Sequence, residues 1–112
     1  MSDVSELRRL AVDLGKAAST DTIRKARLAV QKAAADIERI AKLKAPVDTG
    51  TLRNSIGSDI RGLTAEIGPT IRYAPFVEYG TARMKPRPFL GPATTVVEPK
   101  FEAAIAALGV VL

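Results

Sequence analysis

The sequence predicts an α+β fold, and two observations carry the prediction. All seven Pro and all five aromatic residues lie between Pro46 and Phe101, so the first 45 residues contain neither type. Apolar residues recur at helical spacing before Pro46 and alternate with polar residues after it. We therefore expect one domain over residues 1–112, with a helical segment over 1–45 and a β-hairpin, a core turn, a basic loop and a C-terminal helix over 46–112.

Two helices are expected in the first 45 residues. The first is short, and its apolar positions are Val4, Leu7, Leu10, Ala11 and Leu14, with Gly15 as its stop. Ser19, Thr20 and Asp21 can cap a second, longer helix, which runs to about Ala45 because the residue before Pro46 is disfavoured in a helix. One face of this long helix is apolar and needs a cover: Ile23, Ala26, Val30, Ala33, Ala34, Ile37, Ile40 and Ala41.

The positive charge is concentrated on the long helix. The formal net charge is +5, and residues 16–44 alone contain eight basic and three acidic residues. Five cations fall on one broad side of the helix: Arg24, Lys25, Lys32, Arg39 and Lys42. The simpler interpretation is a solvated face, and the alternative is a surface for phosphates or an acidic partner. No aromatic residue lies among these cations, so stacking on nucleic-acid bases is not expected there.

A turn and a β-hairpin are expected after Pro46. Asp48 and Gly50 favour a tight turn. Residues 52–61 and 63–68 alternate apolar and polar side chains, which predicts two strands joined at Gly62. Pro69 should end the second strand.

The segment from Ile71 to Thr81 holds three of the five aromatic residues and predicts one helical turn with Pro75 near its start and Gly80 at its end. We expect its large apolar side chains, together with Phe89, to form the heart of the core: Tyr73, Phe76 and Val77. Glu78 lies among them. A buried carboxylate needs a partner, and we expect Arg53 or Arg87 to pair with it.

The residues after Gly80 predict a loop and a last helix. Arg83, Lys85 and Arg87 are separated by Pro86 and Pro88, which is typical of an exposed, semi-rigid loop suited to acidic partners. Pro92 can occupy the first turn of a C-terminal helix, and Pro99 inside that helix should kink or restart it. The inward positions of this helix are Val97, Phe101, Ile105 and Leu108.

Three blocks of sequence, in order, resemble the small neck or tail-completion proteins of long-tailed bacteriophages. They cover residues 45–56 (APVDTGTLRNSI), 73–81 (YAPFVEYGT) and 87–93 (RPFLGPA). The positions that carry the resemblance are Pro46, Asp48, Thr49, Gly50, Leu52, Arg53, Tyr73, Ala74, Val77, Glu78, Gly80, Thr81, Pro88, Phe89, Leu90, Pro92 and Ala93. The chain departs from the family at Gly91, where a basic residue is frequent, and at Pro99.

The resemblance implies a structural virion protein without catalytic activity. Such a protein, made in the bacterial cytoplasm, would assemble as a ring of six or twelve copies at the head–tail neck, where it would join head and tail around the DNA channel. Its partners would be other copies of itself and the adjacent head-closure and tail-terminator proteins, with non-specific DNA contact in the channel. The candidate contact residues for these partners or for DNA are Arg24, Lys25, Lys32, Arg39, Lys42, Arg83, Lys85 and Arg87.

Two alternatives come from other functional classes. Asp48-Thr49-Gly50 is the triplet of aspartic proteases, and a retropepsin-like dimer would use Asp48 from each chain in a carboxylate dyad. The helical first half, Thr51 after the glycine and Pro46 before the aspartate all argue against it. The second alternative is a non-specific nucleic-acid-binding protein, whose affinity would fall steeply with salt.

Overall fold

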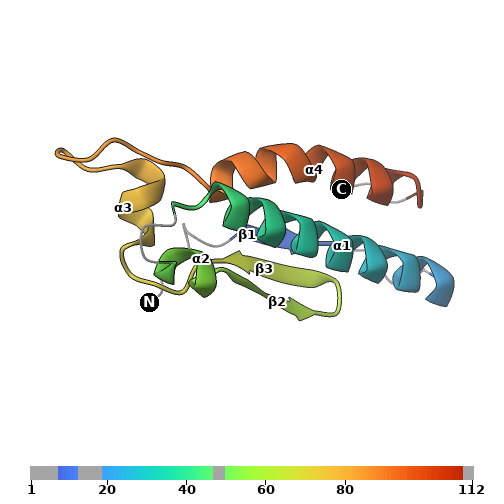
Figure 1. The fold of residues 1–112 in the computed structure, drawn as a ribbon. Coiled ribbons are helices and arrows are strands. Elements are labelled where there is room, and N and C mark those ends of the chain that lie inside the picture. The colour runs from blue at the N-terminus through green and yellow to red at the C-terminus, as the bar shows by residue number, and fades with distance from the viewer. Residues whose placement is uncertain (1–7, 13–18, 47–49, 110–112) are drawn as a thin grey trace.

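The computed structural model describes residues 8–12, 19–46 and 50–109. In chain order the elements are β1 (Arg8–Ala11), α1 (Thr20–Lys44), α2 (Thr51–Ser55), β2 (Gly57–Arg61), β3 (Thr64–Gly68), α3 (Ala74–Tyr79) and α4 (Leu90–Ala106). They form an elongated molecule of 52 × 25 × 22 Å, with α3 and the loop after it at one end (Figure 1). The α+β fold predicted from the sequence is confirmed.

The long helix α1 begins and ends where the sequence predicts. The Ser19 hydroxyl accepts a hydrogen bond from the Thr22 backbone N–H at 3.1 Å and so caps the first turn. Ala45, just before Pro46, has extended backbone and ends the helix. The predicted apolar face is buried at Ala26, Val30, Ala33, Ala34, Ile37 and Ala41. Its small side chains let the neighbouring elements approach closely.

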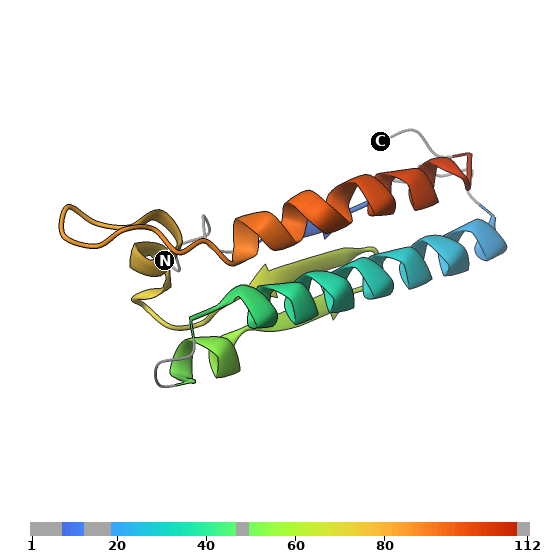
Figure 2. The same ribbon diagram turned by 45° about the horizontal axis from the view of Figure 1, so that its top comes forward.

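Helix α1 contacts both the sheet and α4. α4 runs beside α1 in the opposite direction, and the sheet lies on another side of α1 (Figures 1 and 2). The strand order is β1-β3-β2, and both pairings are antiparallel. Leu10, Ala65 and Ile67 on the inner face are buried, whereas Arg9, Asp59 and Glu66 on the outer face are exposed. The core therefore lies around α1.

The prediction of a first, short helix is wrong for residues 8–11, which form the strand β1. Leu10 and Val12 are buried, whereas Arg9 and Ala11 are exposed, which is the period of a strand. Val12 N–H donates to the Leu63 carbonyl at 3.1 Å and continues the pairing with β3. The free edge of β3 supplies hydrogen bonds that outweigh a weak local helical preference. The remaining residues of that predicted helix, including Gly15, lie outside the described residues.

The hairpin about Gly62 is confirmed, but its first strand begins at Gly57 and not at Leu52. Residues 51–55 form the short helix α2 instead. Leu52 and Ile56 are both buried, which fits either periodicity because they are four residues apart. Asn54, however, is exposed, although alternation places it inside. Asn54 N–H donates to the Gly50 carbonyl at 2.9 Å, a helical hydrogen bond.

Helix α4 is continuous through Pro99 and does not restart there. Val97, Phe101 and Ile105 are buried as predicted, Leu108 is half-buried, and Pro92 lies in the first turn. Pro99 is exposed, on the side of α4 away from these residues. The carbonyl that Pro99 leaves without an N–H partner can therefore reach water.

Candidate functional site

The aromatic residues of α3 are exposed, contrary to the prediction that they form the heart of the core. The exposed fractions are 40% for Tyr73, 56% for Phe76 and 61% for Tyr79. Ala74, Val77 and Glu78 occupy the buried face of α3. The three aromatic residues follow one another at i, i+3 and i+6 and therefore share the other face. Val77 and Phe89 are buried, so for these two the core prediction is confirmed.

Glu78 is buried, with an exposed fraction of 7%, and its carboxylate is held by backbone N–H groups at the start of α4. Oε1 accepts from Phe89 at 3.1 Å and from Leu90 at 2.9 Å, and Oε2 accepts from Gly91 at 3.1 Å. Negative charge is favoured at a helix N-terminus, where the first N–H groups have no partner inside the helix. Glu78 thus joins α3 to α4 through three backbone N–H groups, partners that the sequence analysis did not predict.

Two glycines lie in close contact with other atoms near this junction. A Cβ at Gly91 would lie 3.1 Å from Glu78 Oε2. Gly80 ends α3 with φ +77°, and a Cβ there would lie 2.8 Å from both the Met84 carbonyl oxygen and the Pro86 nitrogen. Only glycine fits this turn without displacing backbone.

The loop after α3 is exposed, as predicted, and is held by its own backbone. Thr81 N–H donates to the Met84 carbonyl at 2.8 Å, and Arg87 N–H donates to the Val77 carbonyl at 2.7 Å. Arg83 and Lys85 are exposed and make no ion pair with any described residue. This loop places two exposed cations at the end of the molecule where α3 lies (Figure 1).

The structure describes only part of the first sequence block, residues 45–56. Asp48 and Thr49 lie outside the described residues. Gly50 has φ +76° as predicted for the turn, Leu52 is buried, and Pro46 is half-buried. Arg53 does not pair with Glu78: its Nε is buried and has no hydrogen-bond partner in the described part of the chain.

The other motif positions divide into buried and exposed. Ala74, Leu90 and Ala93 are buried and Pro92 is half-buried, whereas Thr81 and Pro88 are exposed in the loop. The exposed aromatic residues are the candidate site that sequence reasoning missed. Their spacing of three residues on one face of a short helix is the signal that could have indicated it.

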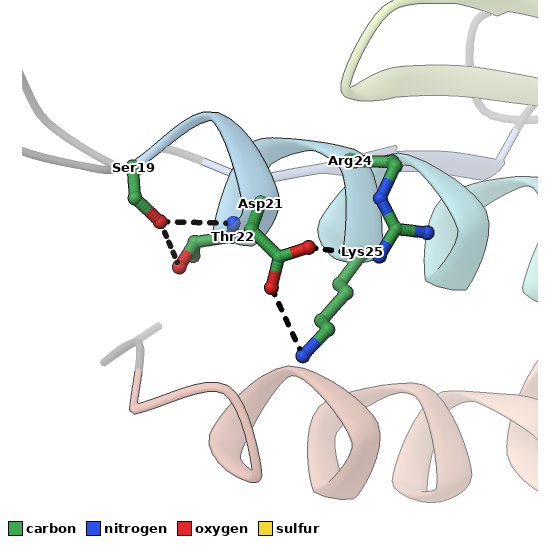
Figure 3. A network of polar contacts seen from close by, with 5 residues as sticks. All are labelled: Ser19, Asp21, Thr22, Arg24 and Lys25. Carbon is green, nitrogen blue, oxygen red and sulfur yellow. Dashed lines mark hydrogen bonds and ion pairs between the residues drawn. The ribbon is translucent and has the colours of Figure 1, made fainter.

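The five cations of α1 that the sequence analysis singles out each lie beside an acid of the same helix. Asp21 accepts from Arg24 at 2.8 Å and lies 3.1 Å from Lys25 (Figure 3). Hydrogen bonds from Arg24 and Lys25, with the charge of Lys25, lower the pKa of Asp21 below its usual value. The remaining pairs are Lys32–Asp36 at 3.2 Å, Arg39–Asp36 at 3.8 Å and Lys42–Glu38 at 3.0 Å. These pairs reduce the positive potential of the helix, and the contact with DNA stays a prediction.

A groove of about 280 Å³ lies between α1 and α4. Its walls are Ala29, Lys32, Ala33 and Asp36 from α1 and Val97, Lys100, Phe101 and Ala104 from α4. Two lysines and one aspartate form its polar part. Nothing in its lining resembles a catalytic set, because Asp36 already pairs with Lys32 and Arg39. In the described ranges no helix combines the length and apolar character that crossing a bilayer requires.

Comparison with known proteins identifies one family. The family model described as "Bacteriophage HK97-gp10, putative tail-component" matches residues 8–80. The match extends from β1 through α3 and includes the first sequence block and all but the last residue of the second, while α4 lies beyond it. No curated protein and no solved structure matches the chain.

Proposed function

The chain belongs to the HK97-gp10-like family of bacteriophage tail components, and from this we propose that it is a neck protein that forms a ring joining head and tail around the DNA channel. The family match supports a structural virion component. Ring assembly and the joining of head and tail are proposals that go beyond the family match. We infer six- or twelve-fold symmetry from the resemblance to neck and tail-completion proteins.

The observation that carries the proposal is the exposed aromatic face of α3. Tyr73, Phe76 and Tyr79 expose three neighbouring aromatic rings on one face of α3, and a contiguous apolar patch at the surface often marks a binding site. Clustered aromatic residues beside cations are typical of protein interfaces. A subunit that is stable only among its neighbours would keep such a surface available.

The partners proposed are other copies of the chain and the adjacent head-closure and tail-terminator proteins. Arg83, Lys85 and Arg87 suit an acidic partner, since all three are exposed at the same end as the aromatic residues. The cations of α1 are less available, because each of the five predicted contact residues already lies beside Asp21, Asp36 or Glu38.

Two measurements test the proposal. Native mass spectrometry and negative-stain images of the purified protein should show closed rings of six or twelve copies, and a monomer at every concentration would overturn the ring. In a phage that encodes the protein, loss of the chain should leave filled heads and separate tails. Intact infectious virions without the protein would overturn the joining role.

We propose no catalytic activity, in keeping with the structural family. The aspartic-protease alternative requires an almost wholly β fold, whereas the described residues include the 25-residue helix α1. A peptide-cleavage assay with the wild type and Asp48→Asn would test it. Cleavage lost in the variant, with the fold intact, would reverse our conclusion.

A further inference from the structure

The outward face of α4 is apolar and has no cover in the described chain. α1 is the principal element that packs against α4, through the face that contains Val97, Phe101 and Ile105. On the other side an exposed stripe of apolar side chains continues along the helix: Val96, Pro99, Ala103, Ala106 and Ala107. α1 differs, because its outward face is charged. Exposed apolar side chains aligned along one helix form a surface on which a partner can pack.

This stripe and the aromatic turn, defined as Tyr73, Phe76 and Tyr79, complement each other in size. The stripe consists mostly of alanines, which leave the helix surface low, whereas the aromatic turn carries three large rings. Large side chains fill hollows above small ones in well-packed interfaces. The large rings of the aromatic turn can therefore pack over the small side chains of the stripe.

The two surfaces also complement each other in charge. Arg83 and Lys85 follow the aromatic turn in the chain, whereas Glu98 and Glu102 lie along one side of the stripe on α4 and Lys100 lies on its other side. In the described part of the chain none of these five side chains makes an ion pair. Opposite charges at the rim of a contact select the partner and its register.

The two surfaces lie apart within one chain. Glu78 holds α3 at the first turn of α4, and the stripe runs from Val96 toward the other end of that helix (Figures 1 and 2). The loop after α3 extends away from α4. The aromatic turn therefore has no route to the stripe of its own chain, and the two can meet only between copies.

We propose that the aromatic turn of one copy docks on the outward stripe of α4 in a second copy. This contact joins different surfaces on its two sides, so it is head-to-tail, and such contacts generate rings when the rotation closes. The inference rests on the proposed ring and assigns the surfaces that form it. Arg83 and Lys85 of one copy face Glu98 and Glu102 of the next.

Cysteine cross-linking tests the contact directly, because the natural chain contains no Cys. The variant Tyr79→Cys/Ala103→Cys should form, on oxidation, a ladder of disulfide-linked copies that collapses on reduction. Each single variant can form at most a dimer. The matched control is Tyr79→Cys/Leu28→Cys, since Leu28 is 52% exposed on α1 and lies outside the stripe. It should give no ladder beyond background.

Native mass measured on the same samples separates the two proposals. Rings with the Tyr79–Ala103 ladder support both, whereas rings without that ladder overturn the contact and leave the ring standing. A ladder of open chains supports the contact and overturns the ring. A monomer without a ladder overturns both.

Variants that leave the fold intact provide a second readout. Phe76→Ser should raise the concentration needed for assembly at least tenfold, whereas Leu43→Ser, at a 68% exposed position on α1, should leave it unchanged. Arg83→Glu/Lys85→Glu should also weaken assembly, and combination with Glu98→Lys/Glu102→Lys should restore it. If Phe76→Ser leaves assembly unchanged and lowers DNA affinity instead, the aromatic turn binds nucleic acid and the contact between copies is wrong.

Discussion

At the scale of single residues, Glu78 is the side chain that connects α3 to α4. It is a buried carboxylate whose hydrogen bonds reach the residues 11, 12 and 13 positions later in the chain. Hydrogen bonds to a charged group are stronger than those between neutral groups. They fix the angle at which α3 presents its aromatic residues.

We expect Glu78→Ala to lower the free energy of unfolding by about 2–3 kcal/mol, because three N–H groups lose a charged acceptor. Thermal unfolding followed by circular dichroism measures this as a fall in Tm of roughly 10 °C or more. The control is Glu66→Ala on the exposed face of β3, which should change stability by less than about 0.5 kcal/mol. Equal effects of the two substitutions would contradict the buried role of Glu78.

Gly80 and Gly62 form a matched pair, since both have positive φ, +77° and +59°, and only Gly80 has backbone atoms close to the position of a Cβ. Gly62→Ala should cost about 1 kcal/mol from the left-handed conformation alone. Gly80→Ala should cost at least about 1 kcal/mol more, because the φ +77°, ψ 178° conformation of Gly80 is open essentially to glycine alone and because Met84 and Pro86 must move. Urea unfolding of both variants measures the difference, and equal costs would show that the loop adjusts freely.

At the scale of elements, side-chain contacts connect α1 to the edge strand β2. Ser58 donates to Glu38 Oε1 at 2.9 Å, and Lys42 donates to Glu38 Oε2 at 3.0 Å. Burial raises the pKa of Glu38, but the hydrogen bonds from Lys42 and Ser58 and the charge of Lys42 outweigh it. The pKa therefore lies below its usual value of 4.5.

Because the folded-state pKa of Glu38 is lowered, its contribution to stability is present above pH 4.5 and is lost as the pH falls through the folded-state pKa. Glu38→Gln should therefore be less stable than the wild type at pH 7, by under about 1 kcal/mol for a partly exposed surface pair. The difference should shrink at pH values below 4.5. Urea unfolding between pH 7 and 3 measures it. A difference that stays constant across this range would contradict the role of the charge.

Pro99 lowers the stability of α4. It has no N–H to donate to the carbonyl of Thr95, and because it is exposed it gains little from packing. Pro99→Ala should raise the free energy of unfolding by about 1 kcal/mol or more, because alanine restores the hydrogen bond and has a higher helix propensity. Thermal unfolding measures the gain, with the exposed Lys100→Ala as the control. A loss of stability would mean that Pro99 holds a bend that the packing on α1 needs.

At the scale of the whole molecule, the subunit is extended and not spherical. A compact domain of this length has a radius of gyration of about 13 Å, whereas this chain has 15.4 Å. An extended subunit has more surface for each residue and less of its own core. That shape suits a component whose stability comes partly from its neighbours.

The net charge of the whole molecule bears on its binding to DNA. With a formal charge of +5 but ion pairs along α1, we expect weak DNA binding without sequence preference. Fluorescence anisotropy with a short duplex should show the affinity falling about tenfold or more between 50 and 200 mM salt, as about two phosphate contacts require. A scrambled duplex is the control. Binding that is insensitive to salt, or that prefers one sequence, would contradict this prediction.

Local patterns in the sequence determined several elements correctly. Ser19 and Pro46 delimit α1, Gly62 marks the hairpin, and Pro75 with Gly80 marks α3. Each of these signals acts within a few residues of the backbone that it shapes. The blocks that resemble phage neck proteins also led to the family that the comparison confirms.

Tertiary structure decided what depends on distant neighbours. Leu10 belongs to a strand because β3 offers a free edge, and Phe76 is exposed because α3 lies at one end of the molecule. Glu78 finds its backbone partners at the start of α4, 11 to 13 residues along the chain. The sequence by itself determined the bounds of α1, the turn at Gly62 and the end of α3, since short-range hydrogen bonds and backbone preferences set these, but it did not indicate β1 or α2. Which faces are covered was decided by long-range packing, because burial depends on every element that approaches a side chain.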